Sequence, residues 1–483
     1  MKKVLNFILR VINVLYKVLP FFLGVYCYYP IFSDQDSLHP FLDAVYASIR
    51  LYGGDTEDGI QVPVLLEVAR FMAIIAMIGI LINLFNKLND IIKRVKLIDA
   101  GATVVYGDSD YADHVFGTLT PRLRIRGEDA FIKNAAKYLL MFSRDTDNLA
   151  FYSRNYEQLK DKQVYIMLDN ISRQNIESPM IRVFSIAENC ARQYWKKHYV
   201  TKDEKIAIIG FGNVGQNILH YGLQLNLIDT EQHFEYHIYG DGTRFRREHT
   251  ELDKMAPDEI NFHNDGIYDP TVLAGFDRII ICEEDNGNVE TLSRLLAAAV
   301  VKNPIFIYSP NGDIITELFG KERVICFGTA DEIASADMIL NERAIEAARR
   351  QNDLYAREHP ESGQPWEKLT TFKRYSNISS VDYSYVIERL LKDKVPVNKI
   401  AELEHIRWCR YHYLNNWKYG PQRDDTNRIH NLLVPFSELS EEERRKDYEA
   451  IKSKLPDIEA DEQQTAIING IVPDIKEDKN GVE

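Results

Sequence analysis

The chain has 483 residues, enough for about three domains of ordinary size. Its 58 Lys and Arg against 72 Asp and Glu give a formal net charge of −14, which excludes a protein that wraps the backbone of a nucleic-acid polymer. The hydrophobic content of 45% excludes both a many-helix transporter and a wholly disordered chain.

Two stretches near the N-terminus predict membrane-spanning helices. Residues 64–85 are apolar with three polar exceptions, and at a rise of about 1.5 Å per residue they cross a hydrocarbon core of about 30 Å. Residues 11–32 end in three tyrosines, which are typical of a membrane interface. A cleaved signal peptide is the alternative for 11–32, but no small-residue cleavage site follows.

The flanks of the two stretches predict their orientation. Lys and Arg gather before residue 11 and after residue 85, whereas the connecting loop is mainly acidic. Because basic flanks remain on the cytoplasmic side, we expect both termini in the cytoplasm and the helices in the inner (plasma) membrane.

The connecting loop has the order of a pore segment. Residues 39–52 read as a short amphipathic helix that leads into a Gly-Gly-Asp turn, with A-x-Y-x-S ahead of it. This order resembles two-span potassium channels, which implies a homo-oligomer, expected to be a tetramer, and a pore lined by Arg50, Leu51, Tyr52, Gly53, Gly54 and Asp55. The stretch departs from the Thr-Val-Gly-Tyr-Gly strand that coordinates potassium, which leaves the conducted ion open. An ordinary extracellular connector is the alternative.

After the spans, short apolar runs alternate with amphipathic stretches, which predicts two Rossmann-like α/β domains over residues 98–200 and 201–350. The second carries G-x-G-x-x-G between a buried strand and a helix. There the first glycine permits a tight turn, the second lets amides approach a pyrophosphate, and the third allows close helix packing. The predicted nucleotide-binding residues are Gly210, Gly212, Asn213, Gly215, Asp241 and Asp265.

The two aspartates carry less weight than the glycines. Asp241 follows Gly210 by 31 positions, where about 20 is usual for a ribose ligand. For Asp265, a solvated loop carboxylate is as good an interpretation as a ligand contact.

The tandem arrangement over about residues 98–345 resembles the regulator-of-potassium-conductance family, also called Trk-type nucleotide-binding domains. The first domain lacks the glycine triplet, so we expect it to serve packing. The resemblance implies a cytoplasmic gating ring below a two-span pore, with NAD or another nucleotide as ligand. No catalytic set accompanies the glycine loop, and the five dispersed cysteines favour neither zinc nor disulfides, so we expect a sensor without catalytic residues or a metal.

Residues 351–371 are polar and contain two prolines, which predicts a linker. Beyond them, A-E-x-x-H-x-x-W, W-x-Y-G-x-x-R-D and H-x-x-L-V-P-x-x-E-L closely resemble the ryanodine-receptor repeat (RyR) domain, a small, mostly α-helical module, over 372–460. The resemblance implies sensing of a nucleotide-derived signal. The acidic tail, 461–483, is expected to be mobile.

The RyR segment is rich in groups that bind nucleotides. Aromatic rings stack on a base, and guanidinium groups hold phosphate. The predicted ligand-binding residues are Glu402, His405, Trp408, Trp417, Tyr419, Arg423 and His430. A core role for both tryptophans and an internal Glu402–His405 pair are equal alternatives, and with His412 as the only further ligand a metal is not predicted.

These expectations combine a membrane segment over 1–97, tandem Rossmann-like domains and a RyR domain. They favour an oligomeric ligand-gated ion channel or pore-forming membrane effector that senses a small nucleotide, with a role in bacterial antiphage defence. One alternative is an NAD- or ATP-regulated potassium channel or transport regulator in ion homeostasis. The other is a membrane-anchored Rossmann enzyme, for which no catalytic set is recognisable.

Overall fold

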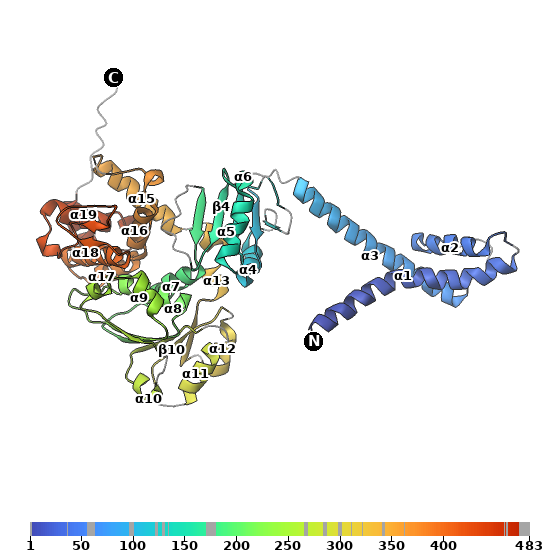
Figure 1. Cartoon of the computed structure of the whole chain (residues 1–483), viewed down its shortest axis with the longest axis horizontal. Coiled ribbons are helices and arrows are strands. Elements are labelled where there is room, and N and C mark those ends of the chain that lie inside the picture. The colour runs from blue at the N-terminus through green and yellow to red at the C-terminus, as the bar shows by residue number, and fades with distance from the viewer. Residues whose placement is uncertain are drawn as a thin grey trace, which may run out of the picture. The chain divides into compact units, whose positions relative to one another are not determined.

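The computed structural model consists of two compact units, Met1–Asp99 and Ala100–Glu483 (Figure 1). The residues that it describes are 2–35, 37–55, 63–95, 101–120, 124–127, 131–133, 135–170, 180–264, 269–283, 287–297, 302–310, 312–320, 322–340, 343–361, 363–457, 459 and 462–472. Residues 2–14, 86, 89–95, 270, 313, 314 and 457 are described by their backbone alone.

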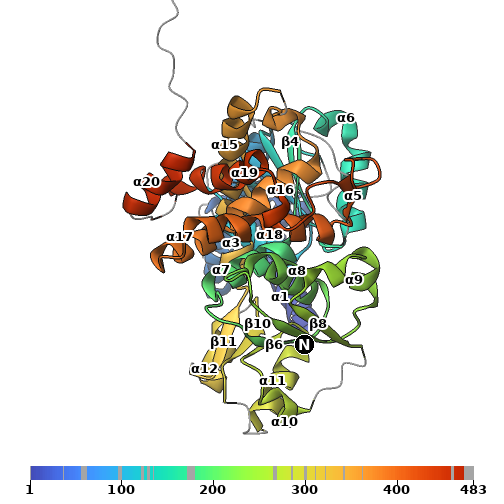
Figure 2. The ribbon, with the colours of Figure 1, turned by 90° about the vertical axis from the view of Figure 1, so that its left-hand side faces the viewer.

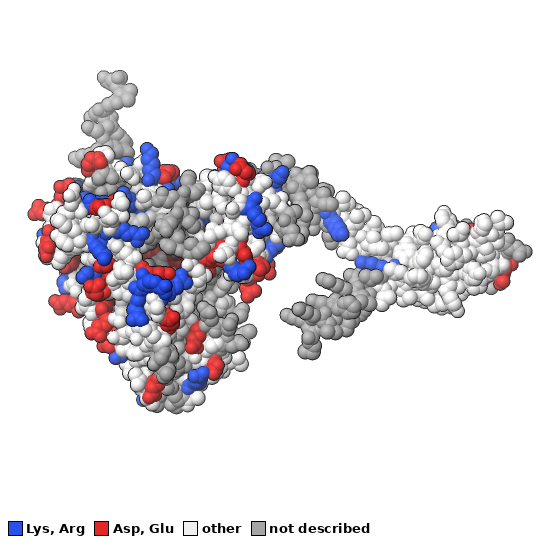
Figure 3. All heavy atoms as spheres, viewed as in Figure 1, with Lys and Arg blue, Asp and Glu red and all other residues white. Residues whose placement is uncertain are grey.

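The first unit is helical. It contains α1 (Lys2–Asp34), α2 (Pro40–Arg50), the 3-10 turn η1 (Leu51–Gly53) and α3 (Val64–Val95). Leu15–Asp34 and Val64–Phe85 are long and apolar enough to cross a membrane. Their outward side chains include Phe22 and Phe71, both more than half exposed, and Figure 3 shows few charged side chains on this unit. The two predicted spans are therefore present as helices that could span a bilayer.

Two glycines let the helices of the first unit pack closely. A Cβ added to Gly24 of α1 would lie 2.7 Å from the Ser48 hydroxyl and 2.8 Å from Leu51, so α2 rests directly on α1. On α3, a Cβ at Gly79 would lie 2.6 Å from the Tyr16 hydroxyl. Both glycines serve helix contacts, for which small residues are commonly used.

The second unit begins with a five-stranded parallel sheet in the order β2-β1-β3-β4-β5. Its strands are β1 (Thr103–Tyr106), β2 (Arg124–Arg126), β3 (Lys137–Leu140), β4 (Gln163–Met167) and β5 (Ile181–Phe184). Its helices are α4 (Asp110–Thr118), α5 (Asp145–Arg154), α6 (Tyr156–Leu159) and α7 (Ile186–Lys197). The short, Arg-rich edge strand β2 lacks the apolar signal that identified the other four.

A six-stranded parallel sheet follows, in the order β11-β10-β9-β6-β7-β8. Its strands are β6 (Lys205–Ile209), β7 (Glu235–Tyr239), β8 (Glu259–His263), β9 (Arg278–Ile281), β10 (Ile305–Tyr308) and β11 (Val324–Phe327). The order is that of dinucleotide-binding Rossmann folds, with its reversal between β6 and β9. The prediction of a Rossmann-like parallel α/β sheet after the glycine motif is confirmed.

Helices join these strands or follow the last of them. They are α8 (Asn213–Leu225), α9 (Thr243–Glu248), η3 (Leu252–Met255), α10 (Pro270–Leu273), α11 (Gly287–Ala297), α12 (Asp313–Phe319), α13 (Ala330–Ile333) and α14 (Ala336–Leu340). Helices α8 to α12 and the 3-10 turn η3 join the strands, and α13 and α14 follow the last strand and contact α4 and α7 of the first sheet.

The C-terminal region is mostly helical. It contains α15 (Arg343–Glu358), η4 (Trp366–Lys368), α16 (Thr371–Asp382), α17 (Ser384–Lys392), α18 (Val397–Leu414), the short parallel pair β12 (Lys418–Tyr419) and β13 (Ile429–His430), η5 (Phe436–Glu438), α19 (Glu441–Lys452), η6 (Leu455–Asp457) and α20 (Glu462–Ile471).

Two predictions for this region need correction. The expected linker 351–371 is partly helical, because α15 continues to Glu358 with buried Asn352 on its inner face. The expected mobile tail contains α20, whose Ile468 is fully buried; residues 473–483 lie outside the described part of the chain.

The C-terminal helices pack directly on the Rossmann-like pair, and Figure 2 shows α17 and α18 over α7 and α8. One core cluster includes Trp195 of α7, Leu219 of α8 and Leu403 of α18. Trp195 donates to the Ile218 carbonyl at 2.8 Å. The sheets and the C-terminal helices therefore share one hydrophobic core.

Candidate ligand-binding cavity

A cavity of about 570 Å³ opens among α15, α16, α18, α19 and the segment around β12 and β13. This volume lies within the range of about 300–1,000 Å³ that is usual for small-molecule sites. Its walls divide into an aromatic side, a buried charged end and an exposed basic rim.

Stacked rings form the aromatic side. Phe372 and Trp417 stack with their centroids 5.1 Å apart and an interplanar angle of 23°. Trp408 lies between His405 and His412, with centroid distances of 5.8 and 4.0 Å. Trp417 is only 5% exposed and belongs to a core cluster, whereas Trp408 is half-buried. Trp408 is thus the tryptophan with more ring surface available to a ligand.

The three histidines of the wall are held neutral. Burial lowers the pKa of His412 to about 3 and that of His430 to about 4, and it also lowers the pKa of His405. The His412 Nδ1 lies 2.8 Å from the Trp408 carbonyl, which requires this nitrogen to donate. The histidines therefore add flat, uncharged surface to the cavity at neutral pH.

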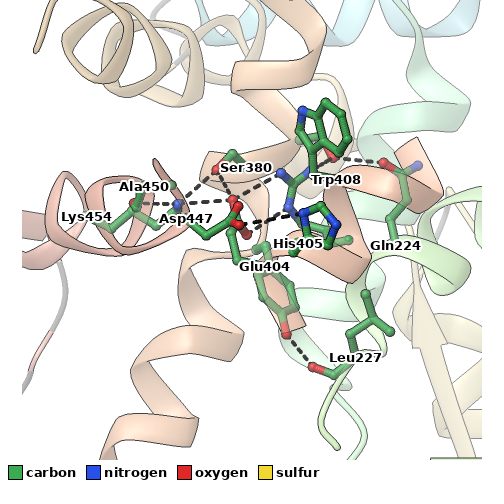
Figure 4. A network of polar contacts seen from close by, with 12 residues as sticks. Gln224, Leu227, Ser380, Glu404, His405, Trp408, Asp447, Ala450 and Lys454 are labelled. Carbon is green, nitrogen blue, oxygen red and sulfur yellow. Dashed lines mark hydrogen bonds and ion pairs between the residues drawn. The ribbon is translucent and has the colours of Figure 1, made fainter. Parts of the chain in front are cut away.

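The buried end contains an ion-pair network (Figure 4). Arg407 donates to both oxygens of Glu404, at 2.9 and 3.0 Å, while Ser380 donates to Glu404 at 2.6 Å. Lys454 lies 3.6 Å from Glu404 and donates to Ser380 at 2.8 Å. Burial opposes the charge on Glu404, but Arg407 and Lys454 outweigh it and lower the pKa of Glu404 to about 2.

Asp447 of α19 lies beside this network. Its Oδ2 is 3.6 Å from the Nδ1 of His405, whose Nε2 lies 2.9 Å from the Val434 carbonyl and therefore donates to it. Burial raises the pKa of the Asp447 carboxyl well above its usual range, and the nearby Glu404 raises it further. A proton on Oδ2 would complete the contact with His405, leaving the other oxygen as an acceptor.

The rim is basic. It contains Lys373, Arg423 and Arg428 with one carboxylate, Asp425. Arg423 donates to both oxygens of Asp425, at 2.6 and 3.2 Å, and Arg428 donates to the Asn415 carbonyl at 2.9 Å. Three positive charges against one negative charge favour an anion at the mouth of the cavity.

The structure brings together five of the seven predicted RyR-domain ligand residues. Those on the cavity wall are His405, Trp408, Trp417, Arg423 and His430. Glu402 and Tyr419 are not on it, and Tyr419 is 58% exposed. The alternative of an internal Glu402–His405 pair finds no support among the described hydrogen bonds, in which His405 contacts Val434 and lies near Asp447.

Sequence reasoning missed several wall residues. Glu404 and Arg407 fall within the recognised motif, and their spacing of three on a helix is the signal for an ion pair. Asn352, Tyr355 and Lys373 come from the segment expected to be a linker or from its edge, where the sequence gives no such signal.

The glycine motif has the expected local geometry. Gly210 has a φ of +85°, and a Cβ there would lie 2.5 Å from the Glu283 amide nitrogen; a Cβ on Gly215 would lie 2.3 Å from the Gly210 carbonyl. Gly212 precedes α8 as its N-cap. Asp241 accepts from the Thr243 amide at 2.9 Å, a local contact in the turn that precedes α9.

Of the other two predicted nucleotide-binding residues, only Asn213 lies among the described residues. Asn213 lines a second cavity of about 240 Å³, formed by α8, α9, α16 and the first sheet's loops. Asp265 lies outside the described residues.

The predicted pore residues form a tight turn rather than an extended strand. Arg50 ends α2 and pairs with Asp55 at 2.5 Å, while Leu51 is fully buried. The Tyr52 hydroxyl donates to the Lys17 carbonyl, and Arg70 donates to the Gly54 carbonyl at 2.9 Å. Gly54 has a φ of +79°, and Gly53 lies in open space in the single chain.

Comparison with known protein families identifies one match. The model of the RyR domain matches residues 381–461, which confirms the resemblance inferred from the motifs. No solved structure matches the chain. The matched segment supplies α18, α19 and the rim residues Arg423 and Arg428. α15 and most of α16, including the rim residue Lys373, complete the cavity from outside it.

Proposed function

We propose that this chain is a subunit of an oligomeric, ligand-gated ion channel or pore-forming membrane effector that senses a nucleotide-type ligand. The observation that carries the proposal is the cavity of about 570 Å³, in which aromatic rings, a buried polar end and a basic rim occur together. Aromatic surfaces stack bases and arginines hold phosphate, so this lining suits a small nucleotide.

The membrane unit supplies the effector. Two spans per chain cannot enclose a pore, so several copies must assemble, and a tetramer is the proposed number. The outward face of α2 carries the exposed apolar residues Phe41, Tyr46 and Ile49, which subunit contacts or lipid would cover. We place the helices in the inner membrane with both termini in the cytoplasm.

The tandem sheets are proposed to act as regulator-of-potassium-conductance domains that transmit ligand binding to the pore. Binding must favour the open state over the closed state to do so. The chain is proposed to be a sensor and not an enzyme, and NAD remains a candidate ligand of the glycine motif. A role in antiphage defence, in which a nucleotide messenger opens the pore, rests on the resemblance of the RyR domain alone.

The turn at Leu51–Gly53 bears on the alternative of a regulated potassium channel. A potassium filter needs an extended row of carbonyls. A 3-10 turn closed by the Arg50–Asp55 ion pair argues for a weakly selective pore.

The experiment is release of ions from liposomes that contain the full-length protein. AMP, ADP and NAD are added separately, and at least one should trigger release. Lys373→Ala together with Arg423→Ala should shift the response to higher concentration, whereas Lys399→Ala, an exposed α18 residue outside the cavity, should not. Tight nucleotide binding without release would refute the channel, and strict potassium preference would favour the homeostatic alternative.

A further inference from the structure

The two ends of the cavity carry different charged groups. The buried end combines the carboxyl groups of Glu404 and Asp447 with the cations Arg407 and Lys454, whereas the rim carries three cations against one carboxylate. A ligand with a donor-rich group at one end and an anionic group at the other therefore has one favourable orientation.

The charged groups of the buried end differ in their availability. Both Glu404 oxygens accept from Arg407, and the Arg407 Nη1 donates to Ser379 at 2.9 Å, so this pair is neutralised within the protein. Asp447 has the His405 ring as its closest partner among the described contacts, at 3.6 Å, and its side chain is 15% exposed. Asp447 thus has acceptor capacity left for a ligand, whereas Glu443, a further acid of the wall, is paired with Lys446 at 2.8 Å.

The rim offers the opposite chemistry. Arg423 is held by Asp425, but Lys373 has no carboxylate within ion-pair distance among the described contacts, and Arg428 donates only to a carbonyl. Trp408 lies on the same wall, with its ring centroid 5.8 Å from that of His405 and 4.9 Å from that of His430.

We infer that the cavity binds an amino-bearing nucleotide in one orientation, with the amino edge of the base at Asp447, the base on Trp408, and the phosphate at Lys373, Arg423 and Arg428. The inference rests on the proposed function, since it specifies the ligand class and pose at the same site. Hydrogen-bond donors on the base match the acceptor oxygen of Asp447, whereas a phosphate placed there would meet this carboxyl group and find Arg407 already engaged by Glu404.

The test uses AMP, purine riboside 5′-monophosphate, adenosine and ribose 5-phosphate as probes, titrated calorimetrically against the full-length protein in nanodiscs. Purine riboside 5′-monophosphate lacks the adenine amine and has no hydrogen-bond donor on that edge of the base, so AMP should bind about tenfold more tightly, as expected for one lost hydrogen bond. Asp447→Leu removes the acceptor oxygen, so it should reduce the ratio of these two affinities to near one.

The rim variants test the other end. Lys373→Ala and Arg423→Ala should each weaken AMP several-fold and leave adenosine affinity unchanged, while Lys399→Ala alters neither. If Asp447→Leu lowers the melting temperature, these partly exposed rim residues still decide the pose. An unchanged AMP/adenosine affinity ratio in the rim variants overturns the inference, as does an unchanged affinity ratio of AMP to purine riboside 5′-monophosphate in a folded Asp447→Leu.

Failure of this inference differs from failure of the proposed function. Binding of none of the four probes overturns the inferred ligand class. If a nucleotide triggers ion release but the rim variants leave the AMP/adenosine affinity ratio unchanged, the proposed function stands and only the pose is refuted. If AMP binds in the inferred pose but no ions are released, the pose stands and the proposed channel is refuted.

Discussion

The side-chain oxygen of Gln224 accepts a hydrogen bond of 2.8 Å from the hydroxyl of Ser379. The same hydroxyl accepts from Arg407 at 2.9 Å, so it donates once and accepts once. Gln224 lies on α8, the helix that follows the glycine motif, and Arg407 lines the RyR cavity. A chain of three side chains therefore links the larger cavity to the Rossmann-like sheet.

Ser379→Ala is expected to weaken this link. It leaves a buried guanidinium N–H and an amide oxygen without their partner, which costs about 1–3 kcal/mol of unfolding free energy. The thermal midpoint of the solubilised protein should fall, whereas Thr201→Ala on the surface should leave it unchanged.

The same variant separates binding from transmission. Ser379 does not line the larger cavity, so nucleotide affinity there should be retained while nucleotide-triggered release from liposomes declines. Release with the wild-type amplitude and concentration dependence would show that coupling follows another route.

A second buried connection joins α18 to the six-stranded sheet. Arg410 donates to Asp258 at 2.6 Å and to the Leu223 and Met255 carbonyls, and both side chains are at most 3% exposed. Arg410→Met leaves Asp258 as an unpaired buried charge, so we expect a loss of about 3–5 kcal/mol.

A double-mutant cycle in chemical denaturation measures this pair. Arg410→Met combined with Asp258→Asn should cost clearly less than the sum of the single changes. Lys160→Ala breaks the exposed ion pair with Glu157 and serves as the control, with an unchanged midpoint. Additive losses at Arg410 and Asp258 would contradict the coupling.

The sequence predicted the parts of the fold that repeat a strong local pattern. Both parallel sheets follow from apolar runs such as those of β6 and β9, and α8 follows from its glycine motif and amphipathic spacing. The edge strand β2 was not predicted because Arg124 and Arg126 interrupt the apolar pattern that identifies a strand. The helix that extends to Glu358 in the expected linker was not predicted, because the prolines and the glycine that follow it indicate an irregular segment.

The candidate site was predicted only where one motif carried it. His405 and Trp408 lie four and seven positions after Ala401 in a recognisable helix, and both reach the cavity. Asp447 and Tyr355 come from other helices, and only the tertiary packing of α19 against α18 and of α15 against α16 brings them to the same cavity. Local spacing cannot encode such long-range contacts.

The glycine motif leads to a third prediction, about what its mutants can prove. Gly210→Ala forces a side chain into a left-handed conformation and against backbone at 2.5 Å, and Gly215→Ala meets a carbonyl at 2.3 Å. Both should lower the melting temperature with and without nucleotide. Gly117→Ala, on α4 with no atom within 4 Å of the added Cβ, is the matched control and should be tolerated.

Gly212 behaves differently because its φ of −71° is open to any residue. Gly212→Asp should fold and place a negative charge at the start of α8. If this variant keeps the melting temperature yet loses NAD binding, the glycine loop holds the nucleotide. If NAD affinity is unchanged, the motif serves packing in this chain.

The fourth prediction concerns acid sensitivity at His412. Burial lowers the pKa of His412 to about 3, whereas an unfolded histidine binds its proton near pH 6.5. A lowered folded-state pKa means that the stabilisation is complete above pH 6.5 and is lost as the pH falls toward 3. At pH 5 the loss from this residue is about 2 kcal/mol.

His412→Asn keeps a donor near the Trp408 carbonyl without titrating, so its melting temperature should decline less between pH 7 and pH 5 than that of the wild type. His233→Asn, at a side chain 45% exposed, should retain the wild-type decline. Equal declines in all three proteins would rule out His412 as a source of acid sensitivity.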